Sequence, residues 1–590
     1  MTRGPLTATL RLMMCVVGIL SPALTFAAEP LRLQPRLRRP IAMVATADKL
    51  LCVANRESGT ISVLDVTRRK VVAETAIGKR LSDLVALPKT PYLLATDEAA
   101  HRLILLDQRG RALTIIDRLE VSYAPVSVVV TDDGRRAIVA SLWSRRLTFV
   151  DIRRTGQQPP KLVTAGTLDL PFAPRQQIAY SQGTRLLVAD AFGGRLAVVD
   201  LKRRQLLATR SLMGHNIRGL AVQGDEPTLL VAHQVLNERT STTHEHVFWG
   251  GVIRSVIRSV PLAELTSDST KPFDLRDTYP LGNPAEGAGD PGAVIVTSKG
   301  ATVVALSGVN EVTIRPAPRQ PFSRRKVGRR PTALIASQDG KQVYVANTFS
   351  DSISVIDPDS LSIGDPIPLG PQPKLSVVER GEVLFHDATL SLDGWYSCQS
   401  CHTDGHTIGL ANDNFGDGYF GDPKRIPSLL GTGDTGPWSW VGGNKTLAKQ
   451  IHKSLTLTMQ GEHVTEGRVA AIAAYVKTLE PVPSVSRLRG TLDEKLFNKG
   501  RKVFVARGCA ECHRGTTFTT SETYDVGLTD KYGHRKFNPP SLRGVSRQRG
   551  FFHDGQAKSL GDVFTKHRHP NGETLPDREL KALLEFLKGL

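Results

Sequence analysis

Cysteine is scarce in this chain, with 6 cysteines among its 590 residues. Cys15 lies in the N-terminal segment, four others fall into two short motifs, and Cys52 remains. A fold held together by a framework of disulfide bonds is therefore excluded, because such folds need several paired cysteines. Cys52 lies in an apolar run, so we expect it to be a buried thiol within a strand.

Long apolar runs are also missing. The run near the N-terminus, Leu12–Leu20, falls short of the ~20 residues that a membrane-spanning helix requires. It follows a positively charged start and precedes small residues ending at Ala28, which is the pattern of a secretory signal peptide. We therefore expect residues 1–28 to be removed. The mature chain should be a soluble periplasmic protein with no transmembrane segment.

Acidic residues are outnumbered, with 57 Asp and Glu against 76 Lys and Arg, which gives a net charge of +19. The basic residues are scattered along an exported chain, so we expect no nucleic-acid partner. A basic surface instead favours an acidic protein partner or an anionic membrane surface. The N-terminal part also lacks a nucleophile elbow and a convincing acid–base pair, which makes a hydrolase with its active site in this part the weakest functional hypothesis.

A repeat occupies the first 370 residues. Its unit is a Val-Ala-polar strand, a turn, and a second apolar strand closed by aspartate. The closing residues Asp65, Asp107, Asp151 and Asp200 lie 42, 44 and 49 residues apart, which is the spacing of propeller blades. With two degenerate copies at Val231–His233 and Val303–Ala305, the pattern predicts a seven-bladed β-propeller over residues 35–370. Tyr344-Val345-Ala346-Asn347 is similar to the motif of the YVTN family of propellers.

One stretch of the repeat, Val235–Pro291, exceeds the length of a blade and predicts a projecting loop. It carries His244, His246 and Trp249. Two histidines this close together can bind a metal, but on a polar loop they are more often solvated. We expect the propeller to act mainly as a scaffold for docking a partner.

Two Cys-x-x-Cys-His pentads follow in the C-terminal third. This spacing is the attachment site of c-type haem, in which both thiols bond the ring and the histidine ligates iron. A zinc site is the alternative, but the histidine in both pentads and the export signal favour haem. We therefore predict two covalently bound haem c groups, each held by two cysteines and one axial histidine: Cys398, Cys401 and His402, and Cys509, Cys512 and His513.

Beyond the linker Gly370–Pro373 the apolar period becomes that of helices. The C-terminal part then aligns with itself, since Ile426-Pro427-Ser428-Leu429 matches Pro539-Pro540-Ser541-Leu542 and the register continues without a gap. In this register Trp440 corresponds to His553. The sequence therefore predicts a multidomain fold, in which the propeller precedes two tandem all-α cytochrome c domains at residues 374–483 and 490–590.

The segments around these pentads resemble the bacterial di-haem cytochrome c peroxidases and their MauG-type relatives. The resemblance rests on Glu379–Asp387 with the run up to His402, on Pro540–Arg543, and on Phe552–Gly555. It implies an oxidoreductase in which the first haem reacts with hydrogen peroxide or a similar oxidant and the second relays electrons. A small redox protein or a protein substrate would be the electron donor.

The resemblance also implies different sixth ligands for the two haems. In the family, the second haem takes this ligand from a helix shortly after the His-Asp-Gly segment. His567 lies there, with His569 as the alternative, whereas the corresponding position in the first half is Ser454, which is not a usual haem ligand. We therefore expect an open first haem and a closed second haem. His553 is expected to contact a haem.

The family places a glutamate near the open iron as a distal acid–base group, because cleavage of the O–O bond needs proton transfer. Glu462 is the candidate in this chain, and Glu466 is less well placed. Four residues compete as sixth ligands that would instead close the first haem: His452, His463, Met459 and His406. Trp440 is the candidate for an electron relay between the haems, although large aromatics more often pack the core.

Calcium between the haem domains is a further implication of the resemblance, with Asn412, Asp413, Asn414 or Asn538 as contributors. The main alternative to an enzyme is a di-haem electron-transfer protein in which both irons are six-coordinate.

Overall fold

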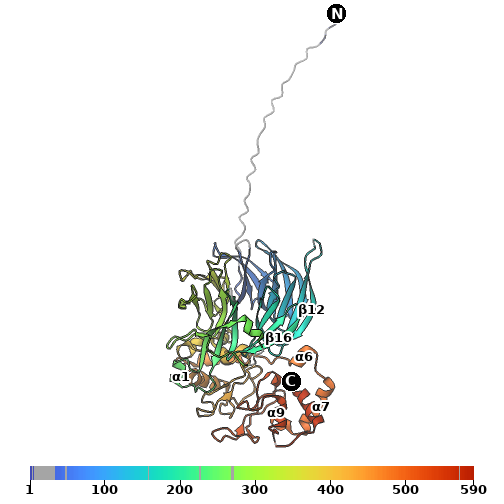
Figure 1. Cartoon of the computed structure of the whole chain (residues 1–590), viewed down its shortest axis with the longest axis vertical. Coiled ribbons are helices and arrows are strands. Elements are labelled where there is room, and N and C mark those ends of the chain that lie inside the picture. Colours follow the sequence, from blue (N-terminus) through green and yellow to red (C-terminus); the bar gives the residue numbers. More distant parts are fainter. Residues whose placement is uncertain are drawn as a thin grey trace.

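A computed structural model describes residues 1–2, 4, 33–46, 50–156, 158–224, 227–267, 271–570 and 572–590. The predicted signal peptide, apart from residues 1, 2 and 4, lies outside the described residues. A β-rich body and a helical body lie against each other (Figure 1). Within the described part of the chain, no helix is long and apolar enough to cross a membrane.

Seven antiparallel sheets, which follow one another along the chain, form the β-rich body. Each of the first four sheets has four strands. The first sheet contains β1 (Pro40–Ala45), β2 (Leu50–Asn55), β3 (Thr60–Asp65) and β4 (Lys70–Ala76), and the second contains β5 (Leu81–Ala86), β6 (Tyr92–Asp97), β7 (Arg102–Arg109) and β8 (Ala112–Glu120). The third contains β9 (Pro125–Val130), β10 (Arg136–Ser141), β11 (Arg146–Arg153) and β12 (Lys161–Asp169), and the fourth contains β13 (Pro174–Tyr180), β14 (Arg185–Asp190), β15 (Arg195–Asp200) and β16 (Gln205–Ser211).

The last three sheets complete a seven-bladed propeller, as the repeat predicts. They are β17 (His215–Gln223), β18 (Thr228–Leu236), β19 (Ile253–Pro261) and β20 (Thr278–Pro280); β21 (Pro291–Val296), β22 (Thr302–Leu306), β23 (Glu311–Arg315) and β24 (Ser323–Lys326); and β25 (Pro331–Ala336), β26 (Val343–Asn347), β27 (Ser352–Asp357), β28 (Ser362–Ile363) and β29 (Ile367–Pro368).

The Val-Ala-polar motif is the second strand of a blade. The strands β2, β6, β10 and β14 bury nearly every residue, because neighbouring blades cover both of their faces. The degenerate copies lie in β18 and β22, which confirms the count of seven. The ring closes through a shared core of the first and last blades and through Asp351, which accepts hydrogen bonds from the backbone N–H groups of Arg38 and Arg39 at 2.9 and 2.7 Å.

The helical body begins beyond the last blade. Its helices are α2 (Val377–Phe385), α3 (Cys398–Cys401), α4 (Leu447–Lys453), a π-helix (Ser454–Thr458), α5 (Glu466–Val476), α6 (Val485–Arg489), α7 (Glu494–Ala506), α8 (Cys509–Cys512), α9 (Leu560–Thr565) and α10 (Asp577–Gly589). The short elements of the chain are α1 (His244–Phe248), the two-stranded pairs β30 (Ala411–Asn412) with β31 (Lys424–Arg425) and β32 (Tyr524–Asp525) with β33 (Lys536–Phe537), and the 3₁₀ turns Leu262–Thr266, Thr348–Ser350, Ala388–Leu390, Leu392–Gly394, Thr403–Gly405 and Val545–Arg547.

The helical body repeats one arrangement twice. Gly381 of α2 lies against the backbone of α5, and Gly500 of α7 lies against the backbone of α10, where a Cβ atom would strike a carbonyl group. Two isolated bridges, Trp438 with Asn444 and Phe551 with Ala557, also keep the register of the sequence alignment. One apolar cluster surrounds each Cys-x-x-Cys-His motif, and the first of these clusters includes propeller residues of the β18–β19 region.

Candidate haem sites

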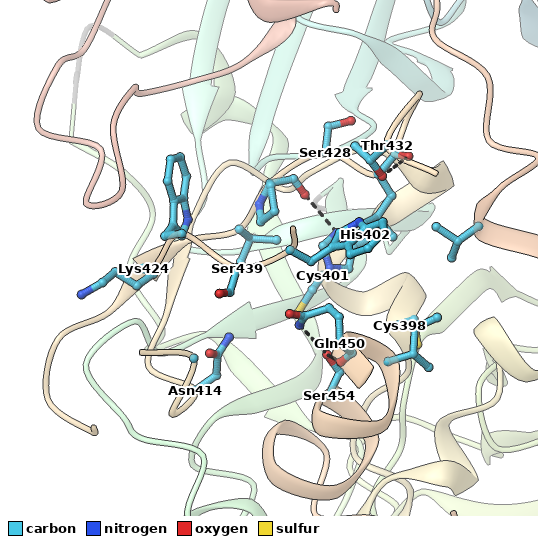
Figure 2. Close-up of a pocket in the computed structure, with 18 of the residues that line it drawn as sticks. Cys398, Cys401, His402, Asn414, Lys424, Ser428, Thr432, Ser439, Gln450 and Ser454 are labelled. Atoms are coloured by element: carbon cyan, nitrogen blue, oxygen red, sulfur yellow. Dashed lines mark hydrogen bonds between the residues drawn. The ribbon is translucent and has the colours of Figure 1, made fainter. Parts of the chain in front are cut away.

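The first motif opens into a cavity of about 270 Å³, hereafter the first cavity (Figure 2). Cys398, Cys401 and His402 all line it, and both thiols are free of disulfide bonds. Pro427 O lies 3.1 Å from His402 Nδ1, so the ring can present Nε2 to an iron as a ligand. Burial lowers the pKa of His402 to about 4, which keeps the imidazole neutral at pH 7. These residues suit a covalently attached haem.

Gln450 and Ser454 provide polar groups in the wall of the first cavity. Gln450 Nε2 donates to Ser454 Oγ at 3.2 Å, and Ser454 Oγ can donate in turn to the carbonyl O of Gln450 at 3.0 Å (Figure 2). Asn444 Nδ2 fixes the amide by donating to Gln450 Oε1 at 2.8 Å. Ser454 is the first residue of the π-helix, an irregularity that is frequent at functional sites.

Glu462 does not reach this wall. Its side chain is exposed and lies with His463 in a separate hollow near Asp387 and Arg468. Glu466, at the start of α5, is also exposed. Among the described residues that line the first cavity, Asp417 is the one carboxylate, and Lys424 pairs with it at 2.8 Å. The structure therefore does not bring the predicted acid–base residue to the first motif.

Of the competing sixth ligands, Met459 lines the first cavity and is 4% exposed. His452 is exposed on α4, and His463 lies in the hollow of Glu462. His406 packs between Trp143 and Phe192 of the propeller, with Nδ1 2.9 Å from Ser428 Oγ.

The second motif opens into a cavity of about 150 Å³, the second cavity, which is lined by Cys509, Cys512 and His513. Phe518 O lies 3.1 Å from His513 Nδ1 and orients this ring in the same way as His402. His569 also lines the second cavity, whereas His567 does not. Burial chiefly, and repulsion from His513 in addition, lower the pKa of His569 to about 4.

His553 lines the second cavity and is 2% exposed. Its ring stacks on Phe537 at 4.3 Å between centroids, and burial lowers its pKa. Its Nδ1 is buried without a hydrogen-bond partner among the described residues, as expected of a group that faces a bound ligand.

Trp440 and Arg425 stand between the two cavities and line both. Trp440 Nε1 donates to Arg425 O at 2.8 Å, and the backbone N–H of Asn538 donates to Trp440 O at 2.8 Å. The Arg425 backbone N–H donates to His553 O at 2.7 Å. Sequence reasoning missed Arg425, although it directly precedes the Ile-Pro-Ser-Leu anchor and aligns with Asn538. These bonds tie Trp440 to both halves of the helical body.

The residues considered for calcium are only partly engaged, because Asp413 Oδ1 and Asn538 Oδ1 are buried without a hydrogen-bond partner among the described residues. Asn414 accepts from Lys453, Asp413 accepts from Ser241 and Gly421, and the side chain of Asn538 donates to Pro437 O. Lys424 Nζ instead lies 2.8, 2.5 and 3.2 Å from three carboxylates, those of Asp417, Asp422 and Asp530. An ammonium group thus provides the positive charge at this junction.

Comparison with known proteins agrees with this geometry. The model of the family described as di-haem cytochrome c peroxidase matches residues 376–488. The chain is 28% identical over 277 residues to hydrazine synthase subunit gamma of Kuenenia stuttgartiensis, an alignment that covers 37% of this chain and 78% of that protein.

Two further relatives point the same way. The chain is 27% identical to the methylamine utilization protein MauG of Methylorubrum extorquens, over 36% of this chain and 77% of that protein. It is 25% identical to the cytochrome c551 peroxidase of Pseudomonas aeruginosa, over 36% of this chain and 78% of that protein. The C-terminal region of this chain is therefore similar to the di-haem cytochrome c peroxidases and MauG proteins, with residues 376–488 matching the family model, and it is joined to a seven-bladed β-propeller.

Proposed function

We propose that this chain is a periplasmic di-haem oxidoreductase whose first haem reacts with hydrogen peroxide or a similar small oxidant, while the second relays electrons. The proposal assigns a signal peptide to residues 1–28, the propeller to 35–370, and two cytochrome c domains to 374–483 and 490–590. The two separate apolar clusters and the repeated bridges support this division.

The difference between the two cavities carries the proposal. Three histidines line the second cavity, His513, His553 and His569, and we take His513 with His569 as the ligand pair of a six-coordinate iron. The first cavity contains one histidine, His402, with Gln450 and Ser454 also in its wall. Serine and glutamine are not usual haem ligands, so the first site has room for a small oxidant. We assign the sixth ligand of the second site to His569 in preference to His567.

Haem c bound at these motifs would supply an iron that changes oxidation state at each site. Cys398 and Cys401, and likewise Cys509 and Cys512, would hold the ring through thioether bonds. His402 and His513 would each offer Nε2, because the backbone carbonyl groups of Pro427 and Phe518 hold the other ring nitrogen. Gln450 Nε2 and Ser454 Oγ would donate hydrogen bonds to a small molecule bound in the first cavity.

Electrons would come from a small redox protein or a protein substrate and would pass by way of Trp440. Its contacts with both halves of the helical body support that role. The propeller would dock such a partner on surface that the helical body leaves free, because one end of the propeller faces the helices (Figure 1).

A second candidate function is electron transfer without catalysis, with both irons six-coordinate. Met459 favours it, because its thioether is a known axial ligand and it lines the first cavity. The lack of an unpaired carboxylate among the described lining residues favours it too.

Electron paramagnetic resonance of the oxidised protein distinguishes the two candidates. The proposal predicts one high-spin and one low-spin ferric signal, and the high-spin signal should respond to peroxide or cyanide. Two low-spin signals that are unchanged by either ligand would favour electron transfer alone. In that case the variant M459A should convert one signal to high spin and so identify the closing ligand.

A further inference from the structure

The haem-attachment helix α3 of the first motif is seated on the propeller. Ser397 Oγ donates to Asp290 Oδ2 at 2.5 Å, and Ser400 Oγ donates to Asp290 Oδ1 at 2.6 Å. Gln234 of β18 adds a bond from Nε2 to Ser400 Oγ at 3.2 Å. One serine precedes Cys398 and the other precedes Cys401, so a propeller carboxylate is hydrogen-bonded to both ends of the segment that carries the thiols.

Asp290 is a buried carboxylate that directly precedes β21 and is 5% exposed. Burial raises its pKa above the usual value, while the two serine donors and the charges of Arg330 and Arg218 oppose that rise. Distances of 2.5 and 2.6 Å between oxygens are typical of a hydroxyl that donates to a carboxylate anion. Two such donors on one carboxyl group, one on each oxygen, leave it as an acceptor at both atoms. The two serine donors and the two arginines thus favour the charged carboxylate beneath the attachment helix, against the burial that opposes it.

Burial chiefly raises the pKa of both thiols of the motif to about 12. Asp290 adds to the rise at Cys398, and Cys398 followed by Asp290 adds to it at Cys401. The loop after the motif is also held, because Asp404 accepts from Arg175 at 3.1 Å and from Arg218 at 3.0 Å, both of the propeller.

The second motif has no equivalent arrangement. Gly508 and Glu511 stand where the first motif has Ser397 and Ser400. The second half of the helical body reaches the propeller through arginines outside its motif, as when Arg547 donates to Trp143 O at 2.8 Å and Arg549 pairs with Asp190. Among the described residues, the contact between carboxylate and attachment helix thus belongs to the first site alone.

We infer that Asp290 is a positioning residue of the first haem site, through which the propeller fixes the attachment helix and places a negative charge beside the haem. A buried negative charge stabilises the oxidised form of iron, which carries one more positive charge than the reduced form. Asp290 therefore lowers the reduction potential of the first haem. This inference requires haem at Cys398 and Cys401, but it does not depend on whether that haem reacts with peroxide.

The test is a spectroelectrochemical titration of the full-length holoprotein carrying D290N, S397A/S400A or D190N. The control D190N neutralises another fully buried propeller carboxylate, one that faces the second half of the helical body. In D290N the potential of the first haem should rise while that of the second stays at its wild-type value. In D190N the potential of the first haem should not change.

The double serine variant separates charge from scaffolding. It keeps the carboxylate but removes both hydroxyl donors, so its first haem should stay nearer the wild-type potential than that of D290N. An unchanged first potential in D290N overturns the inference, and so does an equal rise in D290N and S397A/S400A. If D290N does not accumulate with two haems, the neutral variant D290S replaces it and the same rise is expected. D290E keeps the charge and should retain the wild-type potential, so a rise in D290E equal to that of the neutral variant also overturns the inference. If the wild-type protein does not react with peroxide while D290N still shifts the first potential, the proposed function fails and this inference stands.

Discussion

The guanidinium of Arg425 lies over the indole ring of Trp440 between the two cavities, with the guanidinium carbon 5.2 Å from the ring centroid. The same arginine accepts the indole N–H at its carbonyl group. Burial lowers the pKa of Arg425 to about 10, so it remains a cation at neutral pH. A cation over an indole face is attracted to the ring electrons and opposes their removal. Arg425 therefore influences how readily Trp440 is oxidised.

Replacing Trp440 by phenylalanine should slow electron transfer between the two sites by about tenfold or more, which corresponds to ~1.4 kcal/mol of activation free energy. The physical reason is that phenylalanine is harder to oxidise and lacks the N–H that is bonded to Arg425. Stopped-flow reduction of the oxidised holoprotein measures this rate. The matched control is W438F, because Trp438 lines the first cavity but not the second. Equal rates in W440F and wild type would show that electrons do not pass between the two sites through Trp440.

Replacing His569 by alanine should convert the second haem from low spin to high spin, because the second cavity then holds one axial histidine. H567A should leave the spectrum unchanged, since His567 does not line the second cavity. Electron paramagnetic resonance of the two ferric variants, compared side by side, gives the answer. A high-spin signal in H567A alone would instead identify His567 as the sixth ligand of the second haem.

Replacing Lys424 by methionine should destabilise the helical body by ~3 kcal/mol, because it leaves buried carboxylates without their cation. The lysine side chain is 8% exposed, and those of Asp417 and Asp530 are 3% and 0% exposed. Thermal unfolding of the two holoproteins measures the loss. The control K299M removes a lysine from an exposed propeller pair with Asp359 and should leave the transition almost unchanged. An equal effect in both variants would contradict a special role for Lys424.

The same cluster predicts how the stability of the wild-type protein depends on pH. Burial opposes the charged form of Asp530, but hydrogen bonds from His534 and Lys424 outweigh it, and the pKa is lowered. Its contribution is present above the unfolded pKa of about 3.9 and is lost as the pH falls through the folded pKa. The pKa of Lys424 is raised despite burial, so its contribution is present below about 10.4 and is lost as the pH rises through the folded value. The free energy of unfolding of K424M should therefore vary less with pH than that of the wild-type protein, in both the acidic and the alkaline range.

The parts of the structure that could be predicted are those whose conformation and burial depend on residues close together in the sequence. The Val-Ala-polar strands are buried because each lies between blades, and the alignment of Trp438 with Phe551 reappears as matching bridges. The family resemblance implies that Glu462 lies near the first iron, but Gly461 packs against the Leu390 carbonyl and the side chain of Glu462 faces solvent.

The position of His567 differs from the prediction for a related reason. The helix α9 ends at Thr565, and Arg568 takes a left-handed conformation with φ 44°, so helical spacing no longer applies beyond the helix end. Asp290 had no signal in the sequence. It lies more than a hundred residues before the motif it supports, and its role appears only when the propeller and α3 meet.

Replacing Gln450 by glutamate should raise the rate of peroxide reduction by about 10²-fold, the lower end of what a well-placed acid–base group contributes. Glutamate has nearly the same shape as glutamine, and Asn444 Nδ2 and Ser454 Oγ are already in position to donate to it. The gain should follow the titration of the new carboxylate and disappear at low pH, where the group is protonated before peroxide binds. Steady-state assays across the pH range measure both effects. The control Q460E adds the same charge at a position where glutamine donates to Thr242 O, outside the cavity, and should give no gain. Equal rates in Q450E and wild type, with haem content unchanged, would mean that Gln450 does not face the bound oxidant.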